Sequence, residues 1–348
     1  MKAEKKYELH ANSLPLLLPG AEMIADSAGA ILRVYGNEYT FSNESAELIK
    51  KTYPYLNGEL KVEEISKEAN APAEDILVLL DYFCQEGVLI DVAIKGALSG
   101  SELVRLVKKE SAFWRKHINN QPFWNRVHSG RCTKKEIQGW GIEFYHYVES
   151  ANEYMANGVA YCRESIDIRQ KLSAQYAEEA DHGQIFLDGL EEDGLRPDLV
   201  INAMPLPSTR ALINFLNETA MESTLVYASV FALMQSDGKD FNIETLNSYY
   251  DGLITDYPFA KGQFSAYLKH ASIDARLGHQ TSVFENLYDN DSVFSEKDVE
   301  RVFYTLRQLT RHFILFYEYI SQYYHSSKAT LPRRSPQLHD FLNPESVV

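Results

Sequence analysis

Acidic and histidine side chains stand at helical spacing in three segments of this 348-residue chain, and the first segment surrounds Glu143. Three- and four-residue spacing puts this glutamate on one helical face with three aromatic residues, Trp140, Phe144 and Tyr147. A carboxylate within such an aromatic stripe is costly unless it is paired, hydrogen-bonded or bound to a metal ion. Glu143 is therefore a candidate metal ligand. The alternative is that it lies at the edge of the stripe and pairs with an arginine.

The second segment runs from Ala177 to His182, where Glu179 and His182 stand three residues apart. We expect both side chains on the same face of one helix, where they would converge on a single ion. Carboxylate di-iron bundles bind metal through Glu-x-x-His pairs of this kind. The alternative is a solvated face, because glutamate-rich helices with an isolated histidine are common.

The third segment contains His270 and Asp274, four residues apart, which present an imidazole and a carboxylate on one helical face. His279 follows five residues after Asp274 and points about 140° away on a regular helix. It could join the same face only if the helix is distorted near Gly278. The alternative is that Asp274 orients His270 as a hydrogen-bonded pair in the core.

The occurrence of such ligands in three segments supports a metal site more strongly than any one segment does. Carboxylates with histidines suit iron or manganese in an oxygen-activating role better than structural zinc. The sequence contains no P-loop, G-x-G-x-x-G, G-x-S-x-G or H-E-x-x-H motif. We therefore expect metal chemistry rather than nucleotide binding or serine hydrolysis.

The elements that carry these residues are predicted to be long helices. Periodicity indicates roughly eight helical segments, at about 102–118, 121–129, 134–162, 164–193, 207–236, 243–255, 259–288 and 296–326. Long helices joined by short loops form bundles, whose interior is where facing side chains build metal or ligand sites. The predicted fold class is mainly α, with a helical bundle as the larger part.

A different pattern precedes the bundle. A hairpin at 31–41 around Gly36-Asn37 is followed by three short helices at about 44–53, 61–68 and 73–87 and by a strand at 88–92. This is the order of a small α+β winged-helix domain. We expect this domain at 1–95, a Gly- and Ser-containing linker at 96–101, an independently folding bundle at 102–330 and a tail at 331–348.

Composition limits the classes of partner. The net charge of −15 would repel nucleic acid, and no run of basic residues offsets it. The three cysteines, Cys84, Cys132 and Cys162, form no metal or disulfide motif, which fits a reducing compartment. The apolar run at 14–19 is short and broken by proline, so we expect no export signal or membrane anchor and a cytoplasmic protein.

The beginning of the bundle resembles the haem-oxygenase-like family that includes thiaminase II and pyrroloquinoline-quinone synthase (PqqC). The resemblance rests on Gln121 to Val127, Gly130, Thr133 to Trp140, and Tyr145. Later residues are similar to the ligand helices of haem-oxygenase-like di-iron oxidases and oxygenases, namely Glu178-Glu179, His182, Leu187, Gly194-Leu195 and Tyr267 to Asp274. The resemblance spans roughly residues 102–324.

The resemblance implies a ligand set drawn from three helices, Glu143, Glu179, His182, His270 and Asp274. This chain departs from the family at two points. The family commonly has a histidine three or four residues after the aspartate, where this chain has Leu277 and Gly278 and offers His279 instead. The intermediate helix usually adds a carboxylate, but residues 227–235 contain none. One iron ion, two iron ions or no metal are therefore all open, because pyrroloquinoline-quinone synthases oxidise without a metal.

The N-terminal region resembles the small PqqD-like peptide-recognition domains of modified-peptide pathways. The resemblance rests on Glu38 to Phe41, Leu56 to Gly58, Val62 to Ile65, and Leu80 to Leu89. Such domains bind a leader peptide as an added strand. The alternative is a domain that only packs against the bundle or mediates dimerisation.

Together these observations favour an iron-dependent, dioxygen-using oxidase or oxygenase in natural-product, modified-peptide or cofactor biosynthesis. Its substrate would be a small molecule or a peptide, and Tyr145, Tyr176 and Arg276 are candidate substrate or proton partners. One alternative is a metal-free oxidase in which His182, His270 and His279 act as acid and base groups. Another is a non-catalytic protein that binds a peptide or small molecule for a partner enzyme. A homodimer is compatible with each of these functions.

Overall fold

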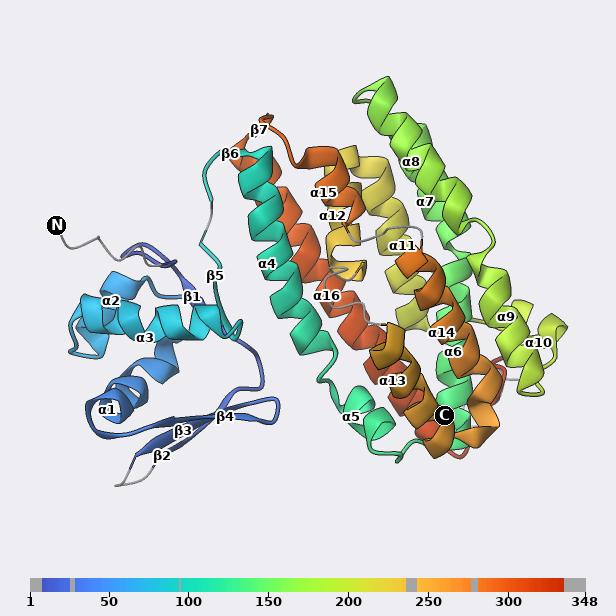
Figure 1. The fold of residues 1–348 in the computed structure, drawn as a ribbon, viewed down its shortest axis with the longest axis horizontal. Helices are drawn as coiled ribbons and strands as arrows, with labels where there is room; N and C mark the ends of the chain where they lie inside the picture. Colours follow the sequence, from blue (N-terminus) through green and yellow to red (C-terminus); the bar gives the residue numbers. More distant parts are fainter. Residues whose placement is uncertain (1–7, 26–28, 94, 236–242, 277–280, 335–348) are drawn as a thin grey trace, which may run out of the picture. The chain divides into compact units, whose positions relative to one another are not determined.

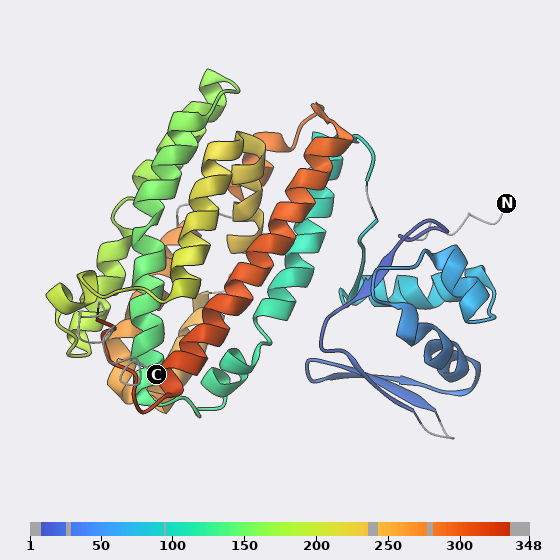
Figure 2. The same cartoon turned by 180° about the vertical axis from the view of Figure 1, so that it is seen from behind.

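A computed structural model of the chain describes residues 8–25, 29–93, 95–235, 243–276 and 281–334. It divides into two compact units (Figures 1 and 2). The first unit consists of Met1–His117 and Val293–Glu300, and the second of Ile118–Ser292 and Arg301–Val348. The expected independent folding of residues 102–330 stays a prediction. Within the expected linker, strand β6 (Leu98–Ser99) is already formed, and helix α4 (Gly100–Ile118) begins directly after it.

The first unit contains a three-stranded antiparallel sheet in the order β2 (Glu22–Ala25), β3 (Ala30–Val34), β4 (Asn37–Phe41). The β3–β4 turn lies at Tyr35-Gly36, one residue earlier than expected, and both residues have positive φ, 50° and 83°. Two successive residues with positive φ give a turn whose twist matches the flanking strands. The hairpin leaves β4 at the edge of this sheet.

Three short helices follow in the expected order, α1 (Asn43–Thr52), α2 (Val62–Glu68) and α3 (Ala73–Gln85). Their apolar faces bury Ile49, Ile65 and Phe83. The next strand, β5 (Leu89–Asp91), pairs with β1 (Pro15–Leu17) rather than with the hairpin. The sequence did not predict β1, because its proline-containing segment has no strand alternation. A further short pair joins β6 to β7 (Val293–Phe294).

The second unit is helical. Its helices are α5 (Pro122–His128), α6 (Lys134–Glu149), α7 (Ala151–Tyr161), α8 (Ile166–Glu179), α9 (His182–Glu192), α10 (Pro197–Ile201), α11 (Pro207–Glu222), α12 (Thr224–Met234), α13 (Ile243–Asp256), α14 (Lys261–Arg276), α15 (Val283–Tyr288) and most of α16 (Glu296–His325). The predicted fold class, mainly α with a helical bundle after a small α+β region, is confirmed. No helix among the described residues is long and apolar enough to cross a membrane.

Three helices that were expected to be continuous are interrupted. The expected helix at 134–162 is divided at Ser150, that at 164–193 at Ala180-Asp181, and that at 207–236 at Ser223. Ser223 is extended, and its hydroxyl accepts a hydrogen bond from the amide of Val226, so it caps the following helix. These three breaks carry no proline or glycine, which explains why periodicity alone did not reveal them. The expected helix at 259–288 is also two helices, α14, which ends at Arg276, and α15, which begins at Val283.

Helices α9 and α14 approach each other closely at two glycines. A Cβ atom on Gly189 would lie 2.6 Å from the carbonyl oxygen of Gly262, and one on Gly262 would lie 2.3 Å from that of Gly189. The carboxylate of Asp193, at the end of α9, accepts hydrogen bonds from the amides of Gly262 and Gln263 at 2.7 and 2.8 Å. This end of α9 is therefore fixed to the beginning of α14.

We expect Gly262→Ala to lower the free energy of unfolding by about 1–3 kcal/mol, because the added methyl group meets backbone atoms that cannot move alone. The matched control is Gly252→Ala in α13, where a Cβ atom meets nothing within 4 Å. Removing that helical glycine should raise the free energy of unfolding by about 0.5–1 kcal/mol. Urea denaturation measures both changes, and equal stability of Gly262→Ala and wild type would contradict the close approach.

Candidate metal centre

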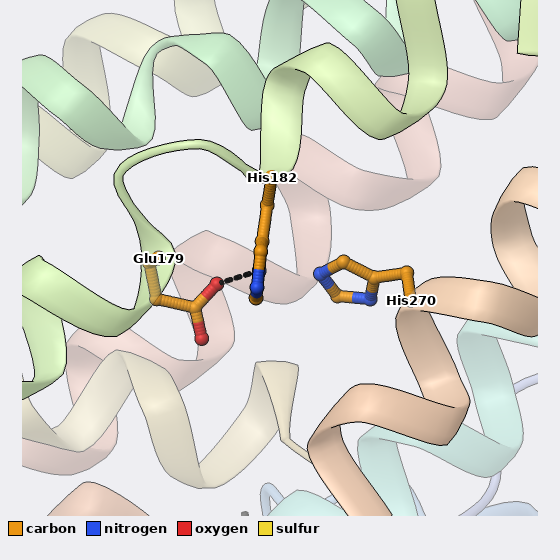
Figure 3. A group of neighbouring side chains, drawn as sticks. All are labelled: Glu179, His182 and His270. Carbon is orange, nitrogen blue, oxygen red and sulfur yellow. Dashed lines mark ion pairs between the residues drawn. The ribbon is translucent and has the colours of Figure 1, made fainter. Parts of the chain in front are cut away.

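Glu179 and His182 face each other across a break between two helices. Glu179 is the last residue of α8, and His182 is the first residue of α9. The expected pair on one continuous helix is therefore wrong in its local structure, because Asp181 leaves the helical conformation with φ −112° and ψ 3°. The two side chains still meet, with 2.6 Å between His182 Nδ1 and Glu179 Oε2 (Figure 3).

His270 completes the group from α14. Its ring centroid lies 4.6 Å from that of His182, and the two rings are nearly perpendicular at 80°. Figure 3 shows Glu179 and His270 directed toward His182 from opposite sides in that view. One ligand atom of each of the three residues lies within 4.8 Å of the others. No other group of three such ligands at this spacing occurs within the described ranges.

The donor set fits iron. Two imidazoles and one carboxylate are the ligands of non-haem iron(II) oxygenases, which keep other coordination positions open. Ligand atoms about 2.0–2.2 Å from one ion lie about 3 Å apart, so small side-chain rotations would close this group around it. The side chains of His182 and Glu179 are only 4% and 14% exposed. A buried carboxylate beside two imidazoles is an environment in which a cation is stabilised.

Three tyrosines from three other helices lie in the electrostatic field of Glu179. They are Tyr147 of α6, Tyr154 of α7 and Tyr227 of α12. Burial raises the pKa of each hydroxyl, and the charge of Glu179 raises it further. The hydroxyls therefore stay protonated at neutral pH and can act as hydrogen-bond donors.

The sequence interpretation missed this tyrosine group as part of the site. Two signals could have indicated it. Tyr147 and Tyr154 are seven residues apart, two helical turns, on the nearly continuous α6 and α7. A Cβ atom on Gly158 would lie 2.4 Å from the ring of Tyr227, so this glycine gives Tyr227 its place against α7.

Aromatic side chains cover the His270 side of the group. Phe186 contacts the rings of His270 and Tyr267, with centroids 5.2 and 5.4 Å apart. Phe144 contacts both Phe186 and Tyr267 at 5.1 and 5.0 Å. These rings restrict water at the group, which strengthens electrostatic interactions within it.

Glu143 is fully buried but does not belong to this group. Its Oε2 accepts hydrogen bonds from the amide of Leu206 at 2.9 Å and the hydroxyl of Thr209 at 2.6 Å. Its Oε1 accepts one from the hydroxyl of Tyr324 at 2.9 Å. Burial raises the pKa of Glu143 above its ordinary value, although these three hydrogen bonds act in the opposite direction. The three hydrogen-bond partners of this carboxylate are neutral, and the positive charge of Arg333 also acts to lower its pKa.

Five further residues were expected at the site, and the structure describes the side chains of two of them. Tyr145 is buried, with its ring centroid 5.3 Å from that of His146, and Tyr176 is half-buried one turn before Glu179. Burial and the charge of Glu149 raise the pKa of Tyr145. The side chains of Asp274 and Arg276 and the whole of His279 lie outside the described residues. The roles expected for these five residues stay predictions.

Comparison with known families bears on the same region. Residues 108–235 match the TENA/THI-4/PQQC family. This match supports the haem-oxygenase-like superfamily that the sequence resemblance indicated. It includes Glu179 and His182 but ends before His270, and it does not reach residues 1–95, so the PqqD-like resemblance stays a prediction.

Several solved structures are similar to this chain. A domain of unknown function with a haem-oxygenase-like fold from Shewanella denitrificans is 21% identical, with a TM-score of 0.49, over 64% of this chain and 93% of that one. A TenA homologue from P. horikoshii is 14% identical, with a TM-score of 0.46, over 63% and 98%. A TenA homologue from Pseudomonas syringae is 14% identical, with a TM-score of 0.48, over 63% and 93%. None of the curated proteins matches this chain.

The hydrogen bonds of Glu143 predict a structural role. We expect Glu143→Ala to lower the free energy of unfolding by about 2–4 kcal/mol, because it leaves three buried donors unpaired and opens a cavity. Glu143→Gln should cost about 1 kcal/mol, since the amide oxygen keeps two donors and the amide nitrogen can donate to Tyr324. Urea denaturation gives the stabilities, and anaerobic titration with iron(II) gives the stoichiometry. A well-folded Glu143→Gln protein that has lost iron binding would overturn this role.

Proposed function

We propose that this protein is a non-haem iron-dependent oxidase or oxygenase that uses dioxygen and acts in natural-product, modified-peptide or cofactor biosynthesis. The observation that supports the proposal is the convergence of Glu179, His182 and His270 inside the helical unit. The match of residues 108–235 to a family that includes enzymes supports a catalytic rather than a purely structural bundle. The substrate would be a small molecule or a segment of a peptide.

Bound iron(II) would supply the activation of dioxygen. Glu179, His182 and His270 would hold the ion. Before it binds, the Glu179 carboxylate keeps the His182 imidazole at the site through the 2.6 Å contact. Tyr154 and Tyr227 would donate hydrogen bonds from hydroxyls that remain protonated at neutral pH. The hydroxyl of Tyr147 donates to the sulfur of Met234. Phe186 and Tyr267 would limit the access of water to the reacting atoms.

A metal-free oxidase is the second candidate, and the contact between Glu179 and His182 favours it. A carboxylate that holds an imidazole is a common arrangement for a general acid or base. His270, with its ring 4.6 Å from that of His182, would be the second proton-transfer group. Both candidates use the same residues, so metal analysis distinguishes them.

The iron proposal predicts that His182→Ala and His270→Ala each weaken iron(II) binding by at least about 100-fold, because losing a ligand costs more than losing a residue that only hydrogen-bonds to a ligand. Circular dichroism should show an unchanged helical content, since the bundle is held by its aromatic core. The matched control is His325→Ala, whose side chain is 70% exposed and outside the group.

The measurement is anaerobic equilibrium dialysis followed by metal analysis. Affinity for iron(II) should also fall as the pH is lowered, because protonated imidazoles and carboxylates cannot bind a metal ion. Unchanged iron binding by His182→Ala would refute the proposed site. Oxidation of substrate by wild-type protein that binds no iron would establish the metal-free candidate instead.

We also propose that the first unit binds a peptide along β4. A groove of about 310 Å³ lies beside this edge strand and is lined by residues of β4, α1 and α3, namely Tyr39, Thr40, Phe41, Ser45, Leu48, Asp75, Val78, Leu79 and Tyr82. Val78 and Tyr82 are 47% and 43% exposed. An unpaired strand edge beside exposed apolar side chains is the arrangement that accepts an added strand.

Val78→Asp should weaken peptide binding by about tenfold or more, because the new carboxylate would be desolvated under the docked peptide. The matched control is Ile24→Asp on β2, at the other edge of the sheet, where the native side chain is 44% exposed. The full-length protein would be titrated with labelled peptides encoded beside its gene and with random duplex DNA. Tight, strongly salt-dependent DNA binding, or equal peptide binding by Val78→Asp and wild type, would overturn the proposal.

A further inference from the structure

A continuous series of aromatic rings leads away from His270 within the second unit. We define the aromatic column as Phe186, Tyr267, Trp140, Trp124, His128 and Tyr249. Successive ring centroids, starting from His270, are 5.2, 5.4, 5.1, 5.2, 5.7 and 5.8 Å apart. Each ring therefore contacts the next.

The two ends of the column differ in their exposure to solvent. Trp140 and Tyr267, near the Glu179–His182–His270 group, are only 4% and 7% exposed. Tyr249, at the far end, is 39% exposed. The column therefore connects the buried group with the surface of the second unit.

The members of the column suit one-electron transfer. Tryptophan and tyrosine are the side chains that lose a single electron most readily. Phe186, Tyr267 and His128 are rings of the column that the electron crosses without their being oxidised. The indole nitrogens of Trp124 and Trp140 are buried and have no hydrogen-bond acceptor. An oxidised indole at either position would keep its proton, so its positive charge can pass to the next ring.

The far end has a proton acceptor. The hydroxyl of Tyr249 and Nε2 of His128 are 3.0 Å apart, a distance that permits direct proton transfer when Nδ1 carries the ring proton. Burial lowers the pKa of His128, which keeps its imidazole neutral, and raises the pKa of Tyr249 to about 12, which keeps its hydroxyl protonated before oxidation. Loss of an electron from Tyr249 can therefore be coupled to loss of its proton.

We propose that the aromatic column carries one-electron oxidising equivalents from the Glu179–His182–His270 group to Tyr249, which traps them as a tyrosyl radical. This inference rests on the oxidative function proposed above. In each event a peroxide-level oxidant at the group gains one electron. Tyr249 loses one electron, and its proton moves to Nε2 of His128. Trp140 and Trp124 are oxidised transiently with their indole protons retained, and they return to their original state; Tyr267 keeps its electron and its proton.

This transfer would protect the site. An oxidant formed in the absence of substrate would otherwise attack the nearest side chains, His182 and His270. Oxidation of Tyr249 instead places the radical on an exposed residue that reductants in solution can reach. If the rings only pack the core, oxidation should instead remain near the group.

The first test uses iron(II)-loaded protein treated with hydrogen peroxide and then frozen. Electron paramagnetic resonance detects the tyrosyl radical, and mass spectrometry of peptides locates oxidised residues. Wild-type protein should form the radical at Tyr249. Trp124→Phe should lose most of it and accumulate oxidation at Trp140, Tyr267 and the histidines. The control Tyr304→Phe, which removes a 51% exposed tyrosine outside the column, should behave as wild type. Equal Tyr249 radical in Trp124→Phe and wild type would overturn the proposal.

The second test needs no iron and separates failure of the column from failure of the proposed function. Metal-free protein is exposed to photogenerated tris(bipyridine)ruthenium(III), a one-electron oxidant that reacts at the surface. Wild-type protein should trap the oxidation at Tyr249, so the comparison uses Tyr249→Phe, in which oxidation should reach the buried Trp140. Tyr249→Phe combined with Trp124→Phe should show none at Trp140. Iron-independent oxidation of Trp140 through Trp124 would support the column even if iron did not bind. Absence of Trp140 oxidation in Tyr249→Phe would refute it even if iron did.

Discussion

The close approach of α9 and α14 is the constraint on which the candidate site depends. Gly189 and Gly262 let the two backbones meet, and Asp193 binds the first amides of α14 at the same end of the contact. His182 lies seven residues before Gly189, and His270 lies eight residues after Gly262. The antiparallel pair therefore brings the two imidazoles together about two helical turns from the glycine contact. A side chain at either glycine would separate the helices along with the ligands they carry.

The sequence predicted which residues of this group lie together better than it predicted their local structure. Spacing and resemblance identified Glu179, His182 and His270, and these three residues converge. The break at Ala180-Asp181 was not predicted, because neither residue interrupts helical periodicity. That break has a structural consequence. Glu179 and His182 meet from the end of one helix and the beginning of the next, so their geometry is set by a turn as well as by helical repeat.

Glu143 shows what spacing alone cannot decide. Its place in an aromatic stripe correctly indicated burial, and burial of a carboxylate requires partners. The partners are Leu206, Thr209 and Tyr324, which lie 63 to 181 residues away along the chain. A sequence pattern local to one helix contains no information about such distant donors. It therefore cannot distinguish a metal ligand from a hydrogen-bonded core acid, and the same holds for the three tyrosines near Glu179.

Charge balance connects the two proposed mechanisms. Glu179 carries its carboxylate in a site where its side chain is only 14% exposed, so a compensating positive charge is strongly favoured. The tyrosine hydroxyls around it stay neutral, and an imidazole becomes positive only by binding a proton. A proton on histidine and a bound metal ion therefore compete for the same compensating role. With a proton, Glu179 and His182 form an acid–base pair; with a metal ion, the same atoms become ligands. The arrangement suits both chemistries for one reason, which is that it stabilises positive charge at a single buried point.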